Sequence, residues 1–309
     1  MSSKYWDDFE KRIDETVYCI KNNIEVPIRR VALFITNKCN FRCRYCNVLF
    51  GNNELSQENF DTIIDKYGKS ALIHITGGEP STVKWLYRVI ESSKDIRFHL
   101  NTNAFEAPPK NVKRLKVSLD TNDKNKFEEI VRVKNSFERV TNNIKEATEN
   151  TIVSITCVLS RQNYRNSPQF MEWCRKEFPK LYAVFFSCYK GTNSDFALTD
   201  EDASIFFNEI RPALEQNMDK ESLELFRETF DQKRRIFGKE RFPENKNKLC
   251  YLSMSERVVN YNGEISRCSH LFRDGIMMTD NEKHEKCISG CNRRLVKFNE
   301  DIERKLNNA

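Results

Sequence analysis

Three cysteines, Cys39, Cys43 and Cys46, directly follow an apolar run at residues 31–36. A short apolar run predicts a buried strand, so the three thiols should share one loop at its end. Three thiolates can bind three corners of a cubane iron–sulfur cluster and leave one iron open to a ligand that is not protein. Zinc normally takes a fourth Cys or His nearby, and thiols without a metal are the third alternative. The spacing favours the open cluster.

A second set of cysteines lies near the C-terminal end, at Cys250, Cys268, Cys287 and Cys291. The dipeptide Asn262-Gly263 predicts a tight hairpin turn between strands at residues 257–261 and 264–267. Such a hairpin would bring Cys250 and Cys268 together. Four cysteines can close every corner of a cluster, although a structural zinc site fits the same spacing.

The composition narrows the class of protein. The chain has 309 residues, of which 39% are hydrophobic, enough for one large domain with a small appendage. No apolar signal region or membrane-spanning run is present, so we expect a cytoplasmic protein with no membrane partner. Eleven cysteines without a secretion signal favour metal or catalytic thiols over disulfides. The net charge of +6 comes from interleaved basic and acidic residues, so charge does not indicate a nucleic-acid partner.

From residue 30 onward, short β-type runs alternate with helical patterns. Six strands are predicted, at residues 31–36, 71–76, 96–102, 112–119, 151–159 and 181–187. Helices are predicted near residues 56–69, 80–93, 124–149 and 165–178. This alternation predicts a parallel sheet with right-handed crossovers. Ligands of such sheets bind at the carboxyl ends of the strands, where the first three cysteines lie.

Cys39, Cys43, Tyr45 and Cys46 fit the pattern C-x3-C-x-aromatic-C, in which the chain resembles the radical S-adenosylmethionine (SAM) superfamily. Three further motifs match at strand ends in the right order: Gly77-Gly78-Glu79-Pro80, Thr102-Asn103 and Ser118-Leu119-Asp120. The chain departs from the family at Ala104 and Thr121, where a glycine is frequent. The resemblance implies an α/β fold, a partial (β/α)6 barrel, with a SAM-binding 4Fe–4S cluster on the first three cysteines.

The resemblance also implies a set of SAM-binding residues: Tyr45, Gly77, Gly78, Glu79, Thr102, Asn103, Ser118, Asp120 and Arg132. The glycines let backbone approach a ligand, and Glu79 can accept a hydrogen bond from the methionine ammonium group. Arg132 can bind the carboxylate and Ser118 can donate a hydroxyl. A helix-start carboxylate is the alternative for Glu79, and a surface ion pair is the alternative for Arg132.

The C-terminal cysteines resemble the twitch or shortened SPASM appendage of radical SAM enzymes. This implies one auxiliary 4Fe–4S cluster on Cys250, Cys268, Cys287 and Cys291. Four segments are therefore expected: an N-terminal helix packed on the barrel at 1–29, the barrel at 30–190, a helical connection at 191–249, and a small β-hairpin and helix iron–sulfur domain at 250–309.

The implied chemistry is reductive cleavage of SAM, after which a 5′-deoxyadenosyl radical abstracts hydrogen from substrate carbon. Flavodoxin or ferredoxin would donate the electron. Only about thirty residues precede the first strand, too few for a leader-peptide-binding domain, which favours a small-molecule substrate over a peptide. Dehydrogenation of a sugar or aminocyclitol is therefore the expected reaction.

The alternatives are peptide maturation and epimerisation, besides an RNA-modifying enzyme and a zinc-stabilised nucleic-acid-binding module. Epimerisation needs a hydrogen donor, for which Cys188 at the end of the sixth strand is the candidate, with Cys157 as the other unassigned thiol. A buried structural cysteine is the alternative for both.

Overall fold

The computed structural model describes residues 7–46, 50–191, 193–230, 247–268, 287 and 293–308. The chain forms two compact units. The larger unit comprises Ile35–Glu54 and Ile75–Glu240, and the smaller comprises Met1–Phe34, Leu55–His74 and Arg241–Ala309. The smaller unit thus combines the N-terminal segment with the C-terminal residues, which the sequence analysis assigned to separate domains.

Parallel strands form the sheet of the larger unit, in the order β6-β5-β4-β3. The strands are β3 (Arg97–Thr102), β4 (Arg114–Ser118), β5 (Ile152–Leu159) and β6 (Ala183–Cys188). Strand β2 (Leu72–Thr76) is next in the order and contributes its last two residues to this unit. All six strands predicted by the sequence are present, and each begins within two residues of its expected start. Each carries buried apolar residues. Strand β1 is described below.

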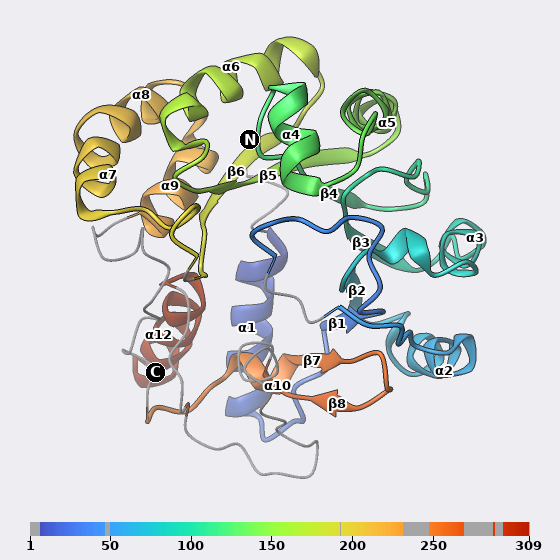
Figure 1. The fold of residues 1–309 in the computed structure, drawn as a ribbon. Helices are drawn as coiled ribbons and strands as arrows, with labels where there is room; N and C mark the ends of the chain where they lie inside the picture. The colour runs from blue at the N-terminus through green and yellow to red at the C-terminus, as the bar shows by residue number, and fades with distance from the viewer. Residues whose placement is uncertain are drawn as a thin grey trace. The chain divides into compact units, whose positions relative to one another are not determined.

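The larger unit contains these helical segments in chain order: η1 (Pro80–Thr82), α3 (Leu86–Ser92), α4 (Lys124–Val131), α5 (Phe137–Asn150), η2 (Tyr164–Asn166), α6 (Ser167–Glu177), α7 (Asp200–Ile205), η3 (Phe206–Ile210), α8 (Arg211–Gln216) and α9 (Lys220–Thr229). Helices α3, α5 and α6 lie along the outer side of the strands (Figure 1). The apolar side chains at alternate strand positions, such as Leu100, Leu115 and Ile155, are 0% exposed. The alternating pattern therefore gives each strand one apolar, buried face.

The prediction of one helix over residues 124–149 was wrong. The chain leaves helical geometry after α4, because Arg132 and Asn135 adopt left-handed φ angles of 60° and 55°. Between α4 and α5, the buried Ser136 hydroxyl donates to the Val133 carbonyl at 2.6 Å. Periodicity alone does not reveal this break, since apolar residues continue at helical spacing on both sides of it.

The smaller unit contains α1 (Asp7–Lys21), β1 (Arg30–Phe34), α2 (Gln57–Tyr67), the start of β2, α10 (Leu252–Ser255), β7 (Glu256–Val259), β8 (Ile265–Ser266) and α12 (Arg293–Asn307). Strand β7 pairs in parallel with β1 and antiparallel with β8. The hairpin therefore extends a sheet edge beside β1, which the sequence analysis did not foresee. No helix of the described residues is long and apolar enough to cross a membrane.

The hairpin turn is wider than predicted. It runs from Asn260 to Glu264, whose backbone groups bond at 3.1 Å, rather than over Asn262-Gly263 alone. The Asn260 side-chain oxygen accepts from the amides of Asn262 and Glu264, both at 2.9 Å. Gly263 has a φ of 83°, which explains the glycine there.

Helix α1 packs on the C-terminal helices. Ile13 and Val17 share one buried cluster with Leu252 of α10 and with Phe298 and Ile302 of α12. The expected N-terminal helix is therefore present, and the partners of its apolar face lie about 240 to 290 residues away along the chain.

A buried carboxylate links three elements of this unit. Glu256 of β7 pairs with Arg12 of α1 at 2.9 Å and with Arg30 of β1 at 3.1 Å. Arg30 also contacts Nδ1 of His74 at 2.5 Å. Burial would raise the pKa of Glu256, but the two guanidinium charges outweigh it and hold the pKa below its ordinary value.

We expect Glu256→Gln to lower the free energy of unfolding by about 3 kcal/mol at pH 7, because it takes the buried carboxylate away from the half-buried guanidinium groups of Arg12 and Arg30. Since the pKa of Glu256 is lower when folded, its contribution is present above the unfolded-state carboxyl pKa and lost as the pH falls through the folded value. Urea unfolding of both proteins from pH 3 to pH 8 measures this.

Glu25→Gln, at an exposed residue, is the matched control and should change stability by less than about 0.5 kcal/mol. If Glu256→Gln were as stable as the wild type at pH 7, the carboxylate would not be the link between these elements.

Candidate functional site

The three N-terminal cysteines lie in a loop that begins where β1 ends. We call residues 35–46 the cysteine loop. Its first residue, Ile35, donates its amide to the Thr76 carbonyl at 2.9 Å, and Thr36 forms an isolated bridge with Glu54. A turn closes its far end, where the Cys46 amide donates to the Cys43 carbonyl at 3.1 Å. The structure thus places Cys39, Cys43 and Cys46 in one loop, as predicted.

The Gly77-Gly78-Glu79 segment after β2 lies directly against the cysteine loop. The Gly78 amide donates to the Thr36 carbonyl, and the Glu79 amide donates to the Lys38 carbonyl, both at 2.7 Å. A Cβ atom on Gly77 would lie 2.4 Å from the Thr36 oxygen, and one on Gly78 would lie 2.0 Å from the Lys38 oxygen. No side chain fits at either position. These glycines therefore permit contact between two backbones of the protein, a role that the sequence analysis had given to a ligand.

Glu79 connects this segment to the end of β3. Its carboxylate accepts hydrogen bonds from the Thr102 hydroxyl and the Asn103 amide, both at 2.7 Å. It also accepts from the Ser81 amide at 3.0 Å and caps η1, so the helix-start alternative describes part of its role. Burial raises the pKa of Glu79, while these donors oppose the shift. The structure thus brings together three predicted SAM-binding residues.

Asn103 leads back to the cysteine loop, because its side-chain amide donates to Asn40 at 2.7 Å. The next residue, Ala104, has a φ of 55° and is fully buried. Left-handed backbone costs alanine about 1–2 kcal/mol, and burying its methyl group returns about 0.8 kcal/mol. Alanine in place of the family's frequent glycine at residue 104 therefore keeps the left-handed conformation at a small cost in free energy.

The opposite side of the cysteine loop rests on the end of α4. The amides of Arg42 and Arg44 each donate at 3.0 Å, to the carbonyls of Val131 and Ile130. Arg132 follows these carbonyls directly and is exposed. Among the described residues it takes part in no ion pair, so the surface-pair alternative finds no support there.

Tyr45 and Asp120 fasten the loop to the end of β4. The Tyr45 hydroxyl donates to the Asp120 carboxylate, which also accepts from the Val158 amide at 2.7 Å. Burial raises the pKa of Asp120 to about 6, although these two donors oppose the shift. The Tyr45 ring lies 5.8 Å from that of Phe196. Asn163 also belongs to this contact, since its side chain donates to the Asp120 carbonyl at 2.9 Å, and no sequence signal pointed to it.

The thiols of the cysteine loop are half-buried. Burial raises the pKa of Cys39 to about 11, and the nearby charges of Glu79 and Cys46 raise it further. Burial likewise raises the pKa of Cys43, with Asp120 and Cys46 adding to the shift. Three thiols in one loop are soft donors of the kind that iron–sulfur clusters take, so the donor set fits a cluster. In the described residues no three side chains yet converge as metal ligands, so the fit rests on the donor set and the loop.

The remaining candidates of the larger unit lie at the ends of its other strands. Ser118 ends β4 and is exposed, opposite Thr156 of β5. Cys188 ends β6 and is 8% exposed, at the same alternate positions as the buried Phe186. Cys157 is fully buried and donates to the Asp120 carbonyl at 3.6 Å. Both cysteines belong to the helix-covered face, which adds no support for a hydrogen-donor role.

Three of the four C-terminal cysteines are described, in the smaller unit. Cys287 exchanges backbone hydrogen bonds with Asn247 at 2.7 Å and Lys248 at 2.8 Å, which places it beside the segment that leads to Cys250. Burial raises the pKa of Cys250 to about 11, and the charges of Cys268 and Cys287 raise it further. Among the described residues these three thiols do not converge as a set of metal ligands. Cys291 lies outside the described residues.

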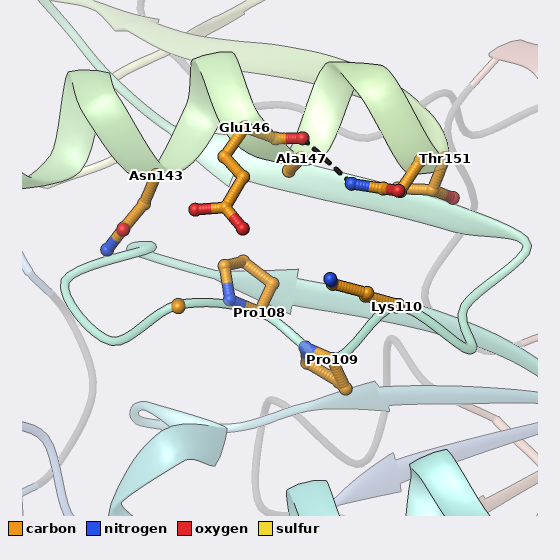
Figure 2. Close-up of a pocket in the computed structure, with 9 residues that line it drawn as sticks. Pro108, Pro109, Lys110, Asn143, Glu146, Ala147 and Thr151 are labelled. Carbon is orange, nitrogen blue, oxygen red and sulfur yellow. Dashed lines mark hydrogen bonds between the residues drawn. The ribbon is translucent and has the colours of Figure 1, made fainter.

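Figure 2 shows a depression elsewhere on the larger unit, between α5 and the segment after β3. Pro108, Pro109 and Lys110 lie on one side of it, and Asn143 and Glu146 of α5 lie on the other. None of the predicted site residues lines it.

Comparison with known proteins finds a matching family and several similar proteins. Residues 33–174 match the Radical SAM superfamily. A probable GTP 3′,8-cyclase of Methanocaldococcus jannaschii is 30% identical over 174 residues, which is 50% of this chain and 58% of that protein. The GTP 3′,8-cyclase of Aliarcobacter butzleri is 28% identical over 189 residues, again 58% of its length. The chain thus spans little more than half the length of these relatives.

The fold is similar to that of a solved structure, Streptococcus suis SuiB bound to precursor peptide SuiA, and this likeness covers most of the present chain. The TM-score is 0.57 at 16% identity, over 90% of this chain and 65% of that one. At this identity the likeness concerns the fold, and it agrees with the predicted α/β barrel.

We expect Gly78→Ala to lower the free energy of unfolding by at least about 2 kcal/mol, because its Cβ would push the Lys38 carbonyl away and break two backbone hydrogen bonds. Gly68→Ala is the matched control: Gly68 has a φ of −58°, so alanine should be neutral or stabilising there. Chemical unfolding of the metal-free proteins compares them. Equal stability of Gly78→Ala and wild type would contradict the close backbone contact.

Proposed function

We propose that this chain is a radical SAM enzyme whose cofactors are SAM and a 4Fe–4S cluster on Cys39, Cys43 and Cys46. The match of residues 33–174 to the Radical SAM superfamily supports this proposal. The observation that supports it most directly is the pair of 2.7 Å backbone bonds between the cysteine loop and the Gly78-Glu79 segment. These bonds place the cluster-binding loop next to a segment that ends in a buried carboxylate. A ligand of the open iron would therefore lie within reach of both.

The residues around the loop would hold SAM. Each oxygen of a carboxylate has two acceptor sites. Oε2 of Glu79 accepts one hydrogen bond, from Asn103, and so keeps capacity for the SAM ammonium group. The exposed Arg132 would bind the methionine carboxylate, and Ser118 and Asn103 would offer further hydrogen bonds. Tyr45 and Asp120 would act chiefly by fixing the loop, since they bond to each other.

When bound, the cluster supplies one electron that splits SAM into methionine and a 5′-deoxyadenosyl radical, which takes a hydrogen atom from substrate carbon to give 5′-deoxyadenosine and a substrate radical. The protein binds and orients both molecules and excludes water. The electron comes from an external one-electron donor, for which flavodoxin or ferredoxin is proposed.

We propose a small molecule as the substrate. The two relatives are named for a reaction of GTP, which favours a nucleotide over the sugar or aminocyclitol expected from the sequence. The proposed step is abstraction of a hydrogen atom from the substrate, which can lead to cyclisation, dehydrogenation or epimerisation. The likeness to SuiB concerns the fold and gives peptide maturation no separate support.

We further propose an auxiliary 4Fe–4S cluster on Cys250, Cys268, Cys287 and Cys291. The hydrogen bonds between Cys287 and the Asn247-Lys248 backbone support it, because they bring one of these cysteines beside the segment that leads to Cys250. A structural zinc ion would satisfy the same ligands.

The test is anaerobic reconstitution with iron and sulfide, followed by metal analysis and an assay for 5′-deoxyadenosine under reduction. Wild type should bind about eight irons and release 5′-deoxyadenosine from SAM. The variant with Cys39, Cys43 and Cys46 all changed to Ala should keep about four irons and release none. Cys174→Ala, at a fully buried residue of α6, is the control and should match the wild type.

Two outcomes would contradict the proposal. A wild-type protein that binds iron but never consumes SAM would not be a radical SAM enzyme. About four irons in wild type, with zinc remaining in the triple variant, would replace the auxiliary cluster by a zinc site.

A further inference from the structure

The turn after β3 has a left-handed residue near its centre. We call residues 102–105 the β3 turn. Ala104 has a φ of 55°, and its amide donates to the Thr102 hydroxyl oxygen at 3.0 Å. The Phe105 amide donates to Oδ1 of Asn103, also at 3.0 Å. Ala104 is fully buried. Because buried backbone groups need hydrogen-bond partners, the carbonyls of this turn have to be paired as well.

The β3 turn joins two parts of the proposed SAM site. Its first two residues each donate a hydrogen bond of 2.7 Å to the Glu79 carboxylate. The Asn103 side chain donates to Asn40 of the cysteine loop at 2.7 Å. The Phe105 ring lies 5.6 Å from the ring of Phe41, in the same loop. A displaced turn would therefore withdraw donors from the carboxylate that is proposed to bind the SAM ammonium group.

Asn143 of α5 supplies the partner of two carbonyls of the turn. Its side-chain nitrogen donates to the Ala104 carbonyl at 2.9 Å and to the Phe105 carbonyl at 3.2 Å. An amide nitrogen carries two hydrogens, one for each carbonyl, and carbonyl oxygens only accept, so the nitrogen end of the side chain must face the turn. Figure 2 shows this half-buried side chain pointing from α5 toward the segment after β3.

A second residue of α5 contacts the same turn. Arg139 lies one helical turn before Asn143 and so on the same face of the helix. Its guanidinium carbon is 4.1 Å from the centre of the Phe105 ring, and it pairs with Glu106 at 2.6 Å. The side chains of that ion pair are 47% and 50% exposed, so the pair contributes little to holding the turn. Asn143, which binds the backbone itself, is the stronger constraint.

We infer that Asn143 is a positioning residue of the proposed SAM site. It holds the β3 turn so that the Thr102 hydroxyl and the Asn103 amide point at the Glu79 carboxylate, and it acts through them without touching the ligand. The inference rests on the proposed function, since that function assigns Glu79 to the SAM ammonium group. A single asparagine within a helical pattern has many structural uses, so the sequence did not point to it.

Two variants test whether Asn143 holds the turn. Asn143→Asp keeps the shape of the side chain, but an ionised carboxylate has no hydrogen to donate. Asn143→Leu removes the donors without adding a charge. In the metal-free protein we expect the Asn103 amide to exchange about tenfold faster in both variants, equal to about 1.4 kcal/mol, because two hydrogen bonds are lost. Asn142→Asp, at the exposed neighbouring residue, should stay within about twofold of wild type.

Ligand binding to the reconstituted protein separates positioning from a general loss of stability. SAM carries the amino acid part that Glu79 is proposed to bind, whereas 5′-methylthioadenosine keeps the adenosine and lacks that part. In calorimetric titrations, both Asn143 variants should bind SAM at least about fivefold more weakly than wild type. Their affinity for 5′-methylthioadenosine should stay within about twofold of wild type, because its binding does not use Glu79.

Wild-type exchange of the Asn103 amide in both variants, wild-type SAM affinity in both, or equal losses for the two ligands would overturn the inference. If Asn143→Leu does not fold, Asn143→Asp decides. The 5′-deoxyadenosine assay on wild type tests the proposed function separately. A wild type that never cleaves SAM removes the proposed function, and the exchange of Asn103 still decides whether Asn143 holds the turn. SAM cleavage by wild type with unchanged exchange in the variants removes the inference alone.

Discussion

The site depends on one close contact between two backbones. Two carbonyls of the cysteine loop accept amides of Gly78 and Glu79 at 2.7 Å, at a separation that excludes any Cβ on Gly77 or Gly78. The contact fixes the start of the loop next to β2. Because loops that carry binding residues are otherwise the most mobile parts of a fold, this contact determines how precisely the three thiols can be positioned.

The other contacts hold the same loop from different directions. Carbonyls at the end of α4 accept the amides of Arg42 and Arg44, Tyr45 reaches Asp120, and Asn40 accepts from Asn103. Glu79 joins these contacts to β3, because its buried carboxylate binds Thr102 and Asn103. Several predicted SAM-binding residues therefore also assemble the loop, and substituting one of them would affect both loop position and ligand binding.

The sequence predicted the strands and the cysteine loop well, because both depend on local patterns. A short apolar run such as residues 152–159, in a chain that alternates strands and helices, predicts a buried strand. A loop then follows the strand. The features that the sequence did not predict depend on the φ angle of a single residue or on pairing between strands that are far apart along the chain. The break at Arg132 requires a left-handed residue that is not glycine. The pairing of β7 with β1 joins residues more than 220 positions apart, and β7 carries Glu256, a charged residue that is unusual in a buried strand until Arg12 and Arg30 are known to face it.

The roles of the candidate residues were only partly readable. The motif pointed to Gly77, Gly78 and Glu79 as ligand-binding residues. Their immediate partners in the structure are protein atoms, and a sequence motif does not distinguish a ligand from a neighbouring loop. Asn163 escaped notice because a single asparagine after a strand has many structural uses.

Amide hydrogen exchange in the metal-free protein tests the central claim most directly, namely that the chain itself holds the cysteine loop in place. The amides of Gly78, Glu79, Arg42 and Arg44 all donate to backbone carbonyls across the contacts of this loop. We expect each to exchange at least about 100-fold more slowly than in an unfolded chain. Exchange of these four amides at unfolded-chain rates, in a protein whose β3 and β4 amides remain protected, would contradict the account.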